Sequence, residues 1–162
     1  MKTYLLKCEK WNSTNLSISL GGQRVGTFFP GMFSSVYKLL LGDNEFDIRK
    51  RNAFNNNLSI YSQGKLLADV QNYPFKNRSI ITTVDKKEYV IKSNTWNNRF
   101  QLSGDEGYLG ESHNKLTSTF ISVNDSIDDL LVAALMAQTH LAYELSTMAA
   151  CFTAVFVVII AT

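Results

Sequence analysis

One phrase of this sequence occurs twice, and its spacing constrains the fold more than any other feature. Asn-Leu-Ser-Ile begins at Asn15 and again at Asn57, and a glycine follows each copy in register, Gly22 or Gly64. In both copies apolar residues alternate with polar ones, which is typical of a strand with one buried face. The glycines then favour turns. The phrase therefore predicts two similar strand–turn–strand units, 42 residues apart.

The repeat extends backwards and occurs a third time in weaker form. Tyr4 and Leu6 match Phe46 and Ile48 at the same spacing, and residues 89–91 match them again with one residue more. Each unit is expected to comprise three strands with a glycine turn before the last. Three units fall below the four to eight blades of a propeller, so we do not expect that fold.

Short alternating runs separated by Gly, Asn and Asp continue to residue 123, and only two prolines interrupt them. They predict an antiparallel all-β body. The expected strands lie near residues 3–9, 15–20, 23–29, 35–41, 45–51, 58–62, 65–71, 79–84, 88–92, 99–103, 108–112 and 116–123. So many short strands indicate a sandwich or a barrel.

The periodicity changes to that of a helix after residue 126. Ser126 and Asp129 have the spacing of a capping box, and the residues that follow are apolar most of the way round. The preceding acids, with no Lys or Arg nearby, do not resemble the flank of a membrane span. We therefore expect a core helix over residues 127–146. The predicted fold is mainly β with one C-terminal helix, a twelve-stranded antiparallel barrel enclosing a central apolar helix.

Three segments resemble the tubby C-terminal-like superfamily, which includes phospholipid scramblases and LURP-one-related proteins. They are SVNDSIDDLLVAALMA (122–137), YKLLLGDNEFDIRKR (37–51) and NLSIYSQGKLLADV (57–70). The resemblance concerns patterns over residues 1–146 and implies that the helix threads the barrel. Scramblases carry a Pro-rich N-terminal region and a cysteine cluster, which this chain lacks, and the phosphoinositide ligands of tubby domains have no matched positions here.

Residues 147–162 form an apolar tail beyond this expected 1–146 domain. From Met148 to Ala161 no residue is charged, and the run is shorter than the ~20 residues of a straight membrane span. Three interpretations remain open: the tail continues the helix into a bilayer as an anchor, packs on protein or a partner subunit, or forms a strand. The predicted membrane or partner contacts are Phe152, Val155, Phe156, Ile159 and Ile160.

Charge is unevenly distributed along the chain. All 16 Lys and Arg lie at or before Lys115, so the first 124 residues carry +6 and the last 38 carry −4. The net charge of +2 is too small to indicate nucleic-acid binding. The predicted anion or lipid-head-group patch comprises Arg49, Arg51, Lys86 and Lys87; the alternative is an ordinary solvated face.

No motif indicates catalysis, a metal or a cofactor. His113 and His140 lack companions at metal-ligand spacing. A functional role for His140 would need an acid or nucleophile that the sequence does not reveal. We therefore expect His140 to be a hydrogen-bonded residue of the core or rim. Cys8 and Cys151 form no disulfide framework. The segments 42–45 and 104–107 resemble fragments of calcium loops but lack the remaining ligands, so we expect turns.

Together these features predict a non-enzymatic, membrane-associated module that binds lipid or a partner. The alternative is an assembly subunit whose tail docks into a homo-oligomer or a larger membrane complex. A carrier of a small apolar ligand is disfavoured because the helix would fill the barrel. No signal peptide is evident, so we expect a cytoplasmic protein, attached to the cytoplasmic face of a membrane through its tail.

Overall fold

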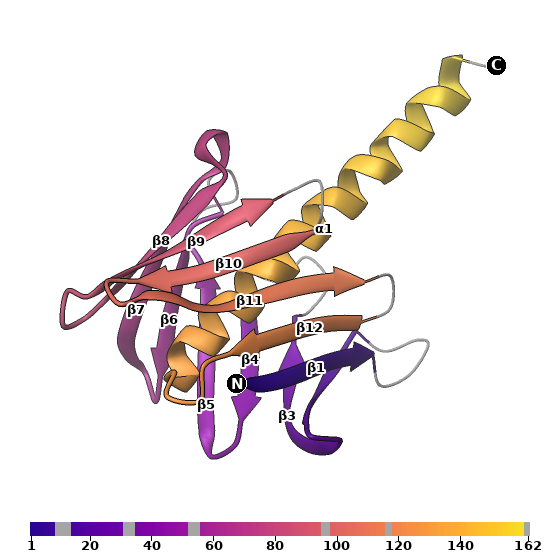
Figure 1. The fold of residues 1–162 in the computed structure, drawn as a ribbon. Helices are drawn as coiled ribbons and strands as arrows, with labels where there is room; N and C mark the ends of the chain where they lie inside the picture. The colour runs from indigo at the N-terminus through magenta and orange to yellow at the C-terminus, as the bar shows by residue number, and fades with distance from the viewer. Residues whose placement is uncertain (9–13, 31–34, 52–55, 95–97, 116–117, 161–162) are drawn as a thin grey trace.

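The computed structural model describes residues 1–8, 14–30, 35–51, 56–94, 98–115 and 118–160, with the backbone alone for residues 145–160. The described residues form twelve strands, one 3₁₀ turn and one α-helix (Figure 1). Their bounds are β1 Lys2–Cys8, β2 Leu16–Leu20, β3 Gln23–Phe29, β4 Val36–Leu41, β5 Asn44–Lys50, β6 Leu58–Ser62, β7 Lys65–Tyr73, η1 Pro74–Lys76, β8 Arg78–Thr83, β9 Glu88–Asn94, β10 Arg99–Gly104, β11 Gly107–Lys115, β12 Ser118–Val123 and α1 Asp129–Ile160.

The strands form a closed antiparallel barrel in which sequence neighbours are also neighbours in space. The barrel closes where β1 pairs with β12, with Tyr4 opposite Ile121. Inward-facing residues such as Ile18, Ile48 and Leu102 are fully buried, while their sequence neighbours face outward. The predicted mainly-β barrel is confirmed, and the segments 42–45 and 104–107 form turns as expected.

The repeat corresponds to three similar parts of the barrel, β1–β3, β5–β7 and β9–β11. The pairing register shifts directly after Ile18, Ile60 and Leu102, which are spaced by 42 residues. Such β-bulges bend a strand and increase its twist, which helps a sheet to close. The repeated phrase therefore places one bend in each third of the barrel.

The extra residue of each bulge lies on β3, β7 or β11, and the residue that follows it on the same strand is small: Gly26, Ala68 or Gly110. A Cβ atom on Gly26 would lie 2.1 Å from the carbonyl oxygen of Leu40 on β4. This distance is far below contact and involves backbone, so the neighbouring strand leaves no room for a side chain there.

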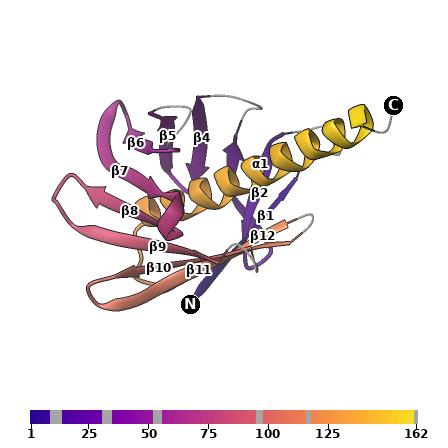
Figure 2. The same cartoon turned by 90° about the horizontal axis from the view of Figure 1, so that it is seen from above.

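Helix α1 fills the barrel. Every residue from Leu131 to Thr139 is buried, because strands surround this part of the helix on all sides (Figure 2). The helix begins later than predicted: the carboxylate of Asp128 accepts a 3.0 Å bond from the amide of Leu130, and the Asp128 carbonyl accepts the first helical bonds. Asp128, and not Ser126, is the N-cap, because its side chain reaches the unpaired amides of the first turn.

The helix extends beyond the core segment expected over residues 127–146, in agreement with the interpretation in which the tail continues it. It continues without a break to Ile160, and its C-terminal part projects beyond the strands (Figures 1 and 2). The interpretation of the tail as a strand is therefore wrong. Its β-branched residues favour strands, but they follow directly on an established helix, where each added residue gains a backbone hydrogen bond.

The two ends of the barrel are distinguished by the helix. At the start end, Asn44 at the beginning of β5 donates a 2.8 Å bond to Asp129 at the beginning of α1. At the exit end, Lys50 at the end of β5 contacts Glu144, where α1 leaves the barrel. Because the strands alternate in direction, odd-numbered strands end at the exit end and even-numbered strands end at the start end.

Candidate functional site

Four side chains converge where α1 leaves the barrel, and we call them the exit cluster: Tyr37, Lys50, His140 and Glu144. The Glu144 carboxylate accepts a 2.6 Å bond from the Tyr37 hydroxyl and a 3.1 Å bond from the Lys50 ammonium. The Nε2 atom of His140, one helical turn earlier, lies 3.4 Å from the other carboxylate oxygen. Glu144 is the only residue with a formal charge from Leu130 onward, and the barrel wall supplies its partners.

Strand alternation and helix periodicity place these groups together. Tyr37 on β4 is paired with Ile48 on β5 and is fully buried, so its hydroxyl points along the inner wall toward the helix. His140 and Glu144 share one helix face because they are four residues apart. The His140 ring packs edge-on against Phe28 and Tyr37, with centroids 5.2 and 5.8 Å away.

The cluster holds Glu144 ionised. Burial is the largest influence on its pKa and would raise it, but bonds from His140, Tyr37 and Lys50 outweigh burial and lower the pKa to about 2. Burial, followed by the bond to Glu144, raises the pKa of the Tyr37 hydroxyl above its usual range. The resulting arrangement fixes the rotation and depth of the helix where it leaves the barrel.

Two further polar contacts hold the buried part of the helix. The amide of Gln138 donates a 2.8 Å bond to the Ser79 hydroxyl on β8. The hydroxyls of Thr139 and Ser112 on β11 lie 2.5 Å apart. Because buried polar groups are costly without partners, these contacts favour one position of the helix over any shifted one.

The predicted patch residues lie at opposite ends of the barrel. Arg49 and Arg51 are at the exit end, with the Arg49 guanidinium 4.6 Å from the Tyr61 ring centroid and Arg51 3.4 Å from Asp69. Lys86 and Lys87 lie in the β8–β9 turn at the start end. The structure therefore does not bring the four cations together, because β5 and β8 run in opposite directions. The side chains of Phe152, Val155, Phe156, Ile159 and Ile160 lie outside the described residues.

The charges of the barrel are sorted between its ends. We counted the connections and the two strand residues on either side of each, using described residues only. Among its described residues, the exit end has eight cations and no acid of the barrel wall: Lys7, Arg49, Lys50, Arg51, Lys76, Arg78, Arg99 and Lys115. The start end, with the first helical residue, has five cations and nine acids: Asp43, Glu45, Asp85, Glu88, Asp105, Glu106, Asp125, Asp128 and Asp129. The helix thus leaves the barrel through a cationic rim.

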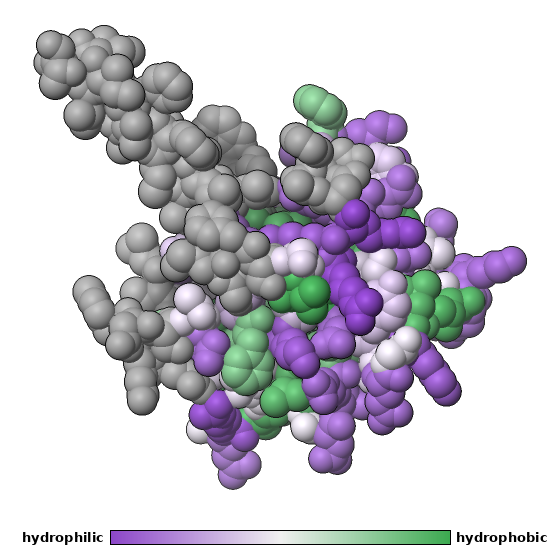
Figure 3. Space-filling model, turned by 180° about the vertical axis from the view of Figure 1, so that it is seen from behind, coloured by the Kyte–Doolittle hydropathy of each residue, from purple (hydrophilic) through white to green (hydrophobic). Residues whose placement is uncertain are grey.

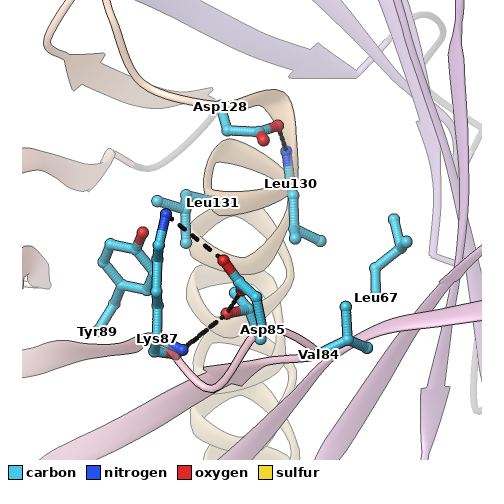
Figure 4. Close-up of a pocket in the computed structure, with 9 residues that line it drawn as sticks. Leu67, Val84, Asp85, Lys87, Tyr89, Asp128, Leu130 and Leu131 are labelled. Atoms are coloured by element: carbon cyan, nitrogen blue, oxygen red, sulfur yellow. Dashed lines mark hydrogen bonds and ion pairs between the residues drawn. The ribbon is translucent and has the colours of Figure 1, made fainter.

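A small cavity lies at the start end, between the β8–β9 turn and the first turn of α1 (Figure 4). Its volume is about 160 Å³, and its apolar lining includes Leu67, Val84 and Leu130. The Asp85 carboxylate accepts a bond from Thr83 and lies 3.4 Å from the Lys87 ammonium, while Asp128 caps the helix. These charged groups already have partners, so we assign no ligand to this cavity.

A second cavity, of about 170 Å³, lies at the exit end beside the helix, and His140 of the exit cluster contributes to its wall. Its lining includes Leu6, Lys115, Ser118, His140 and Tyr143. On the face of the molecule in Figure 3, hydrophilic side chains separate small groups of apolar ones among the coloured residues. In the described parts of the chain, no group of His, Cys, Asp and Glu is arranged to hold a metal ion.

Neither the exit cluster nor the sorting of charges was predicted from the sequence. The spacing of His140 and Glu144 by one helical turn was a usable signal for the first. For the sorting of charges, the signal was that successive connections between strands alternate between basic and acidic. This alternation becomes visible once each connection is assigned to one end of the barrel.

No family model, curated protein or solved structure matches this chain. Among the described residues, no helix is both long enough and apolar enough to cross a membrane.

Proposed function

We propose that this protein is a non-enzymatic, membrane-attached module that sits on an anionic membrane surface, with the continuation of α1 embedded in the bilayer. The observation that carries this proposal is the single unbroken helix from Asp129 in the barrel to Ile160. Its C-terminal part belongs to the apolar run that begins at Met148, in which no residue is charged. An apolar helix that projects from a barrel requires a covering surface, and a bilayer provides one.

The length of this continuation sets how deeply it can enter. Residues 146–160 measure about 22 Å at 1.5 Å per residue, compared with a hydrocarbon core of about 30 Å. Residues 146–160 are therefore long enough to pass through one leaflet and into the other. The proposed attachment is therefore an anchor held by the barrel.

The charge distribution supports an orientation with the exit end toward the membrane. The eight cations of the exit end surround the projecting helix, and the acids of the start end lie on the opposite side of the barrel. Anionic lipids attract Lys and Arg near the surface by about 1 kcal/mol each. The same lipids would repel the start end, so one orientation is favoured. We place the protein on the cytoplasmic face, where such lipids concentrate.

The exit cluster supports a mechanical role. If the tail is held in a bilayer, the load on the protein passes along α1 to the barrel. The bonds of Glu144 to Tyr37 and Lys50 join the helix to β4 and β5 at the point where it leaves. The helix also fills the interior of the barrel, which argues against a carrier that holds a small apolar ligand there.

Vesicle flotation tests the proposal, with the full chain compared to a chain that ends at Ser146 and to a full chain carrying Val155→Lys and Ile159→Lys. Only the unaltered full chain should float with vesicles, and the bound fraction should rise with the content of anionic lipid. Circular dichroism verifies that the altered chains keep the barrel.

The alternative, a tail that docks into a homo-oligomer, makes a different prediction. In that case the full chain would run as a defined oligomer in size-exclusion chromatography without detergent and would stay behind when vesicles float. That result would contradict membrane attachment.

A further inference from the structure

Phe75 is the most exposed large apolar residue among those described, with a relative exposure of 103%. It is the middle residue of η1, in the β7–β8 connection, which rises above the neighbouring strands at the top left of Figure 1. Isolated exposed apolar residues are common on soluble proteins. The case for a role therefore depends on how this residue is held and on what surrounds it.

The backbone keeps Phe75 on a formed turn. Pro74 begins η1, where its fixed φ favours the turn, and Asn77 closes it with a left-handed φ of 47° and a 3.2 Å bond from its amide to the Pro74 carbonyl. The amide of Ser93 on β9 donates a 2.8 Å bond to the Asn77 carbonyl. The turn is thus attached to two strands and presents Phe75 outward.

Two cations follow Phe75 closely in the chain. Lys76 follows it directly, and the guanidinium of Arg78 lies 5.6 Å from the ring centroid of Tyr73. An apolar side chain with basic groups close behind it is the composition of interfacial membrane contacts, because the ring enters the acyl boundary while the cations meet anionic head groups. This turn belongs to the exit end, from which α1 also projects.

We propose that Phe75 inserts into the bilayer as a second membrane contact, with Lys76 and Arg78 at the level of the head groups. This inference rests on the proposed membrane attachment and adds to it a contact made by the barrel itself. Two separated contacts, Phe75 and the continuation of α1, fix the tilt of the barrel on the surface, which one helix alone leaves free.

The start end offers a matched control. Val84 is 62% exposed in the β8–β9 turn, which is also a connection between neighbouring strands. Its next residue is Asp85, and the surrounding rim is acidic. Val84 therefore shares the exposure and turn setting of Phe75, but it faces away from the membrane in the proposed orientation.

Depth-dependent quenching tests the inference in the full chain. Trp11 and Trp96 are replaced by phenylalanine, and a single tryptophan is introduced by Phe75→Trp or, as the control, Val84→Trp. Each protein is mixed with vesicles of phosphatidylcholine and phosphatidylserine with or without bromine on the acyl chains. The emission of the tryptophan at position 75 should shift to the blue and be largely quenched by the brominated lipid, whereas that at position 84 should be unchanged.

The outcomes separate the inference from the proposed function. If the protein floats with the vesicles but the tryptophan at position 75 is not quenched, the insertion of Phe75 is wrong and the tail anchor stands. If the protein does not float, both are wrong. A blue shift that grows with protein concentration in the absence of vesicles would assign Phe75 to a contact between copies and overturn the membrane insertion.

Discussion

The hydroxyl of Tyr37 on β4 donates a 2.6 Å hydrogen bond to the carboxylate of Glu144, 107 residues later on α1. This bond joins the wall of the barrel to the helix at the point where the helix leaves it. Lys50 and His140 complete the surroundings of the carboxylate. The stability of the barrel and the position of its helix are therefore coupled through one ionised group.

Removal of the Tyr37 hydroxyl should destabilise the protein. In Tyr37→Phe the Glu144 carboxylate loses its shortest bond, and bonds to charged groups contribute about 1.5–3 kcal/mol. We expect a decrease of about 2 kcal/mol in the free energy of unfolding, measured by urea denaturation. Tyr61→Phe is the control because that ring faces Arg49 on the outer wall. Equal stability of the two variants would contradict the role of the bond.

Acid should weaken the fold through Glu144. Its folded pKa is lowered to about 2 from 4.5, so the unfolded chain binds the proton more readily. The stabilisation is complete above the unfolded pKa and is lost as the pH falls from about 5 to about 2. Its upper limit is about 3 kcal/mol.

The Glu144→Gln variant isolates this contribution. Its free energy of unfolding should be lower than that of the parent at pH 7, and the difference should shrink as the pH falls toward 3. Glu45→Gln, which changes an exposed carboxylate 3.7 Å from Lys38, should follow the parent throughout. If the difference in free energy of unfolding between Glu144→Gln and the parent stayed constant with pH, folding would not lower the pKa of Glu144.

Gly26→Ala should strain the barrel at its first bulge. The added Cβ would lie 2.1 Å from the Leu40 carbonyl oxygen, and relief requires a shift of β3 or β4. We expect a loss of about 2–3 kcal/mol, as for other overpacked sites, in thermal or urea unfolding. Gly104→Ala is the matched control, since its Cβ would meet the Tyr89 ring at 2.9 Å and a side chain moves more easily than backbone. A larger loss for Gly104→Ala would show the reasoning to be wrong.

Charge reversal should affect vesicle binding at one end only. Arg49→Glu with Arg51→Glu removes cations from the rim around the helix, whereas Lys86→Glu with Lys87→Glu makes the same change of net charge at the start end. The first pair should lose about 10-fold or more in affinity for anionic vesicles, at about 1 kcal/mol per cation removed and with added repulsion. The second pair should be close to the parent in co-sedimentation.

Equal losses for the two pairs would show that net charge alone governs binding and would contradict the proposed orientation. Both experiments are run at the same ionic strength, because salt screens these interactions.

The strands were predictable from local pattern because each has one buried face. Most of the twelve expected ranges agree with the observed strands within two residues, for example 23–29 and 58–62. The one larger difference is the end of β11, which extends to Lys115 where residue 112 was expected. End positions depend on pairing with the neighbouring strand, which alternation alone does not specify.

The helix showed both the strength and the limit of sequence patterns. Over residues 131–139 the helix carries only apolar or uncharged side chains around its whole circumference. This pattern alone indicated a helix buried in the barrel. Its first residue was not predicted, and its continuation to Ile160 was one of three interpretations that the sequence left open. The N-cap is the residue whose side chain reaches the free amides of the first turn. The capping-box pattern placed it at Ser126, two residues before the observed Asp128.

The sequence by itself determined the class of fold, because alternation at period two, repeated turns and one apolar helix admit few arrangements that bury every apolar face. Only the tertiary structure decided which residues meet at the exit cluster and which charges share an end of the barrel. Tyr37 and Glu144 are brought together by the closure of the barrel and by the depth at which the helix sits in it. Neither of these can be read from a short stretch of sequence. Arg49 and Lys87 both looked like parts of one basic patch, but the direction of their strands places them at opposite ends.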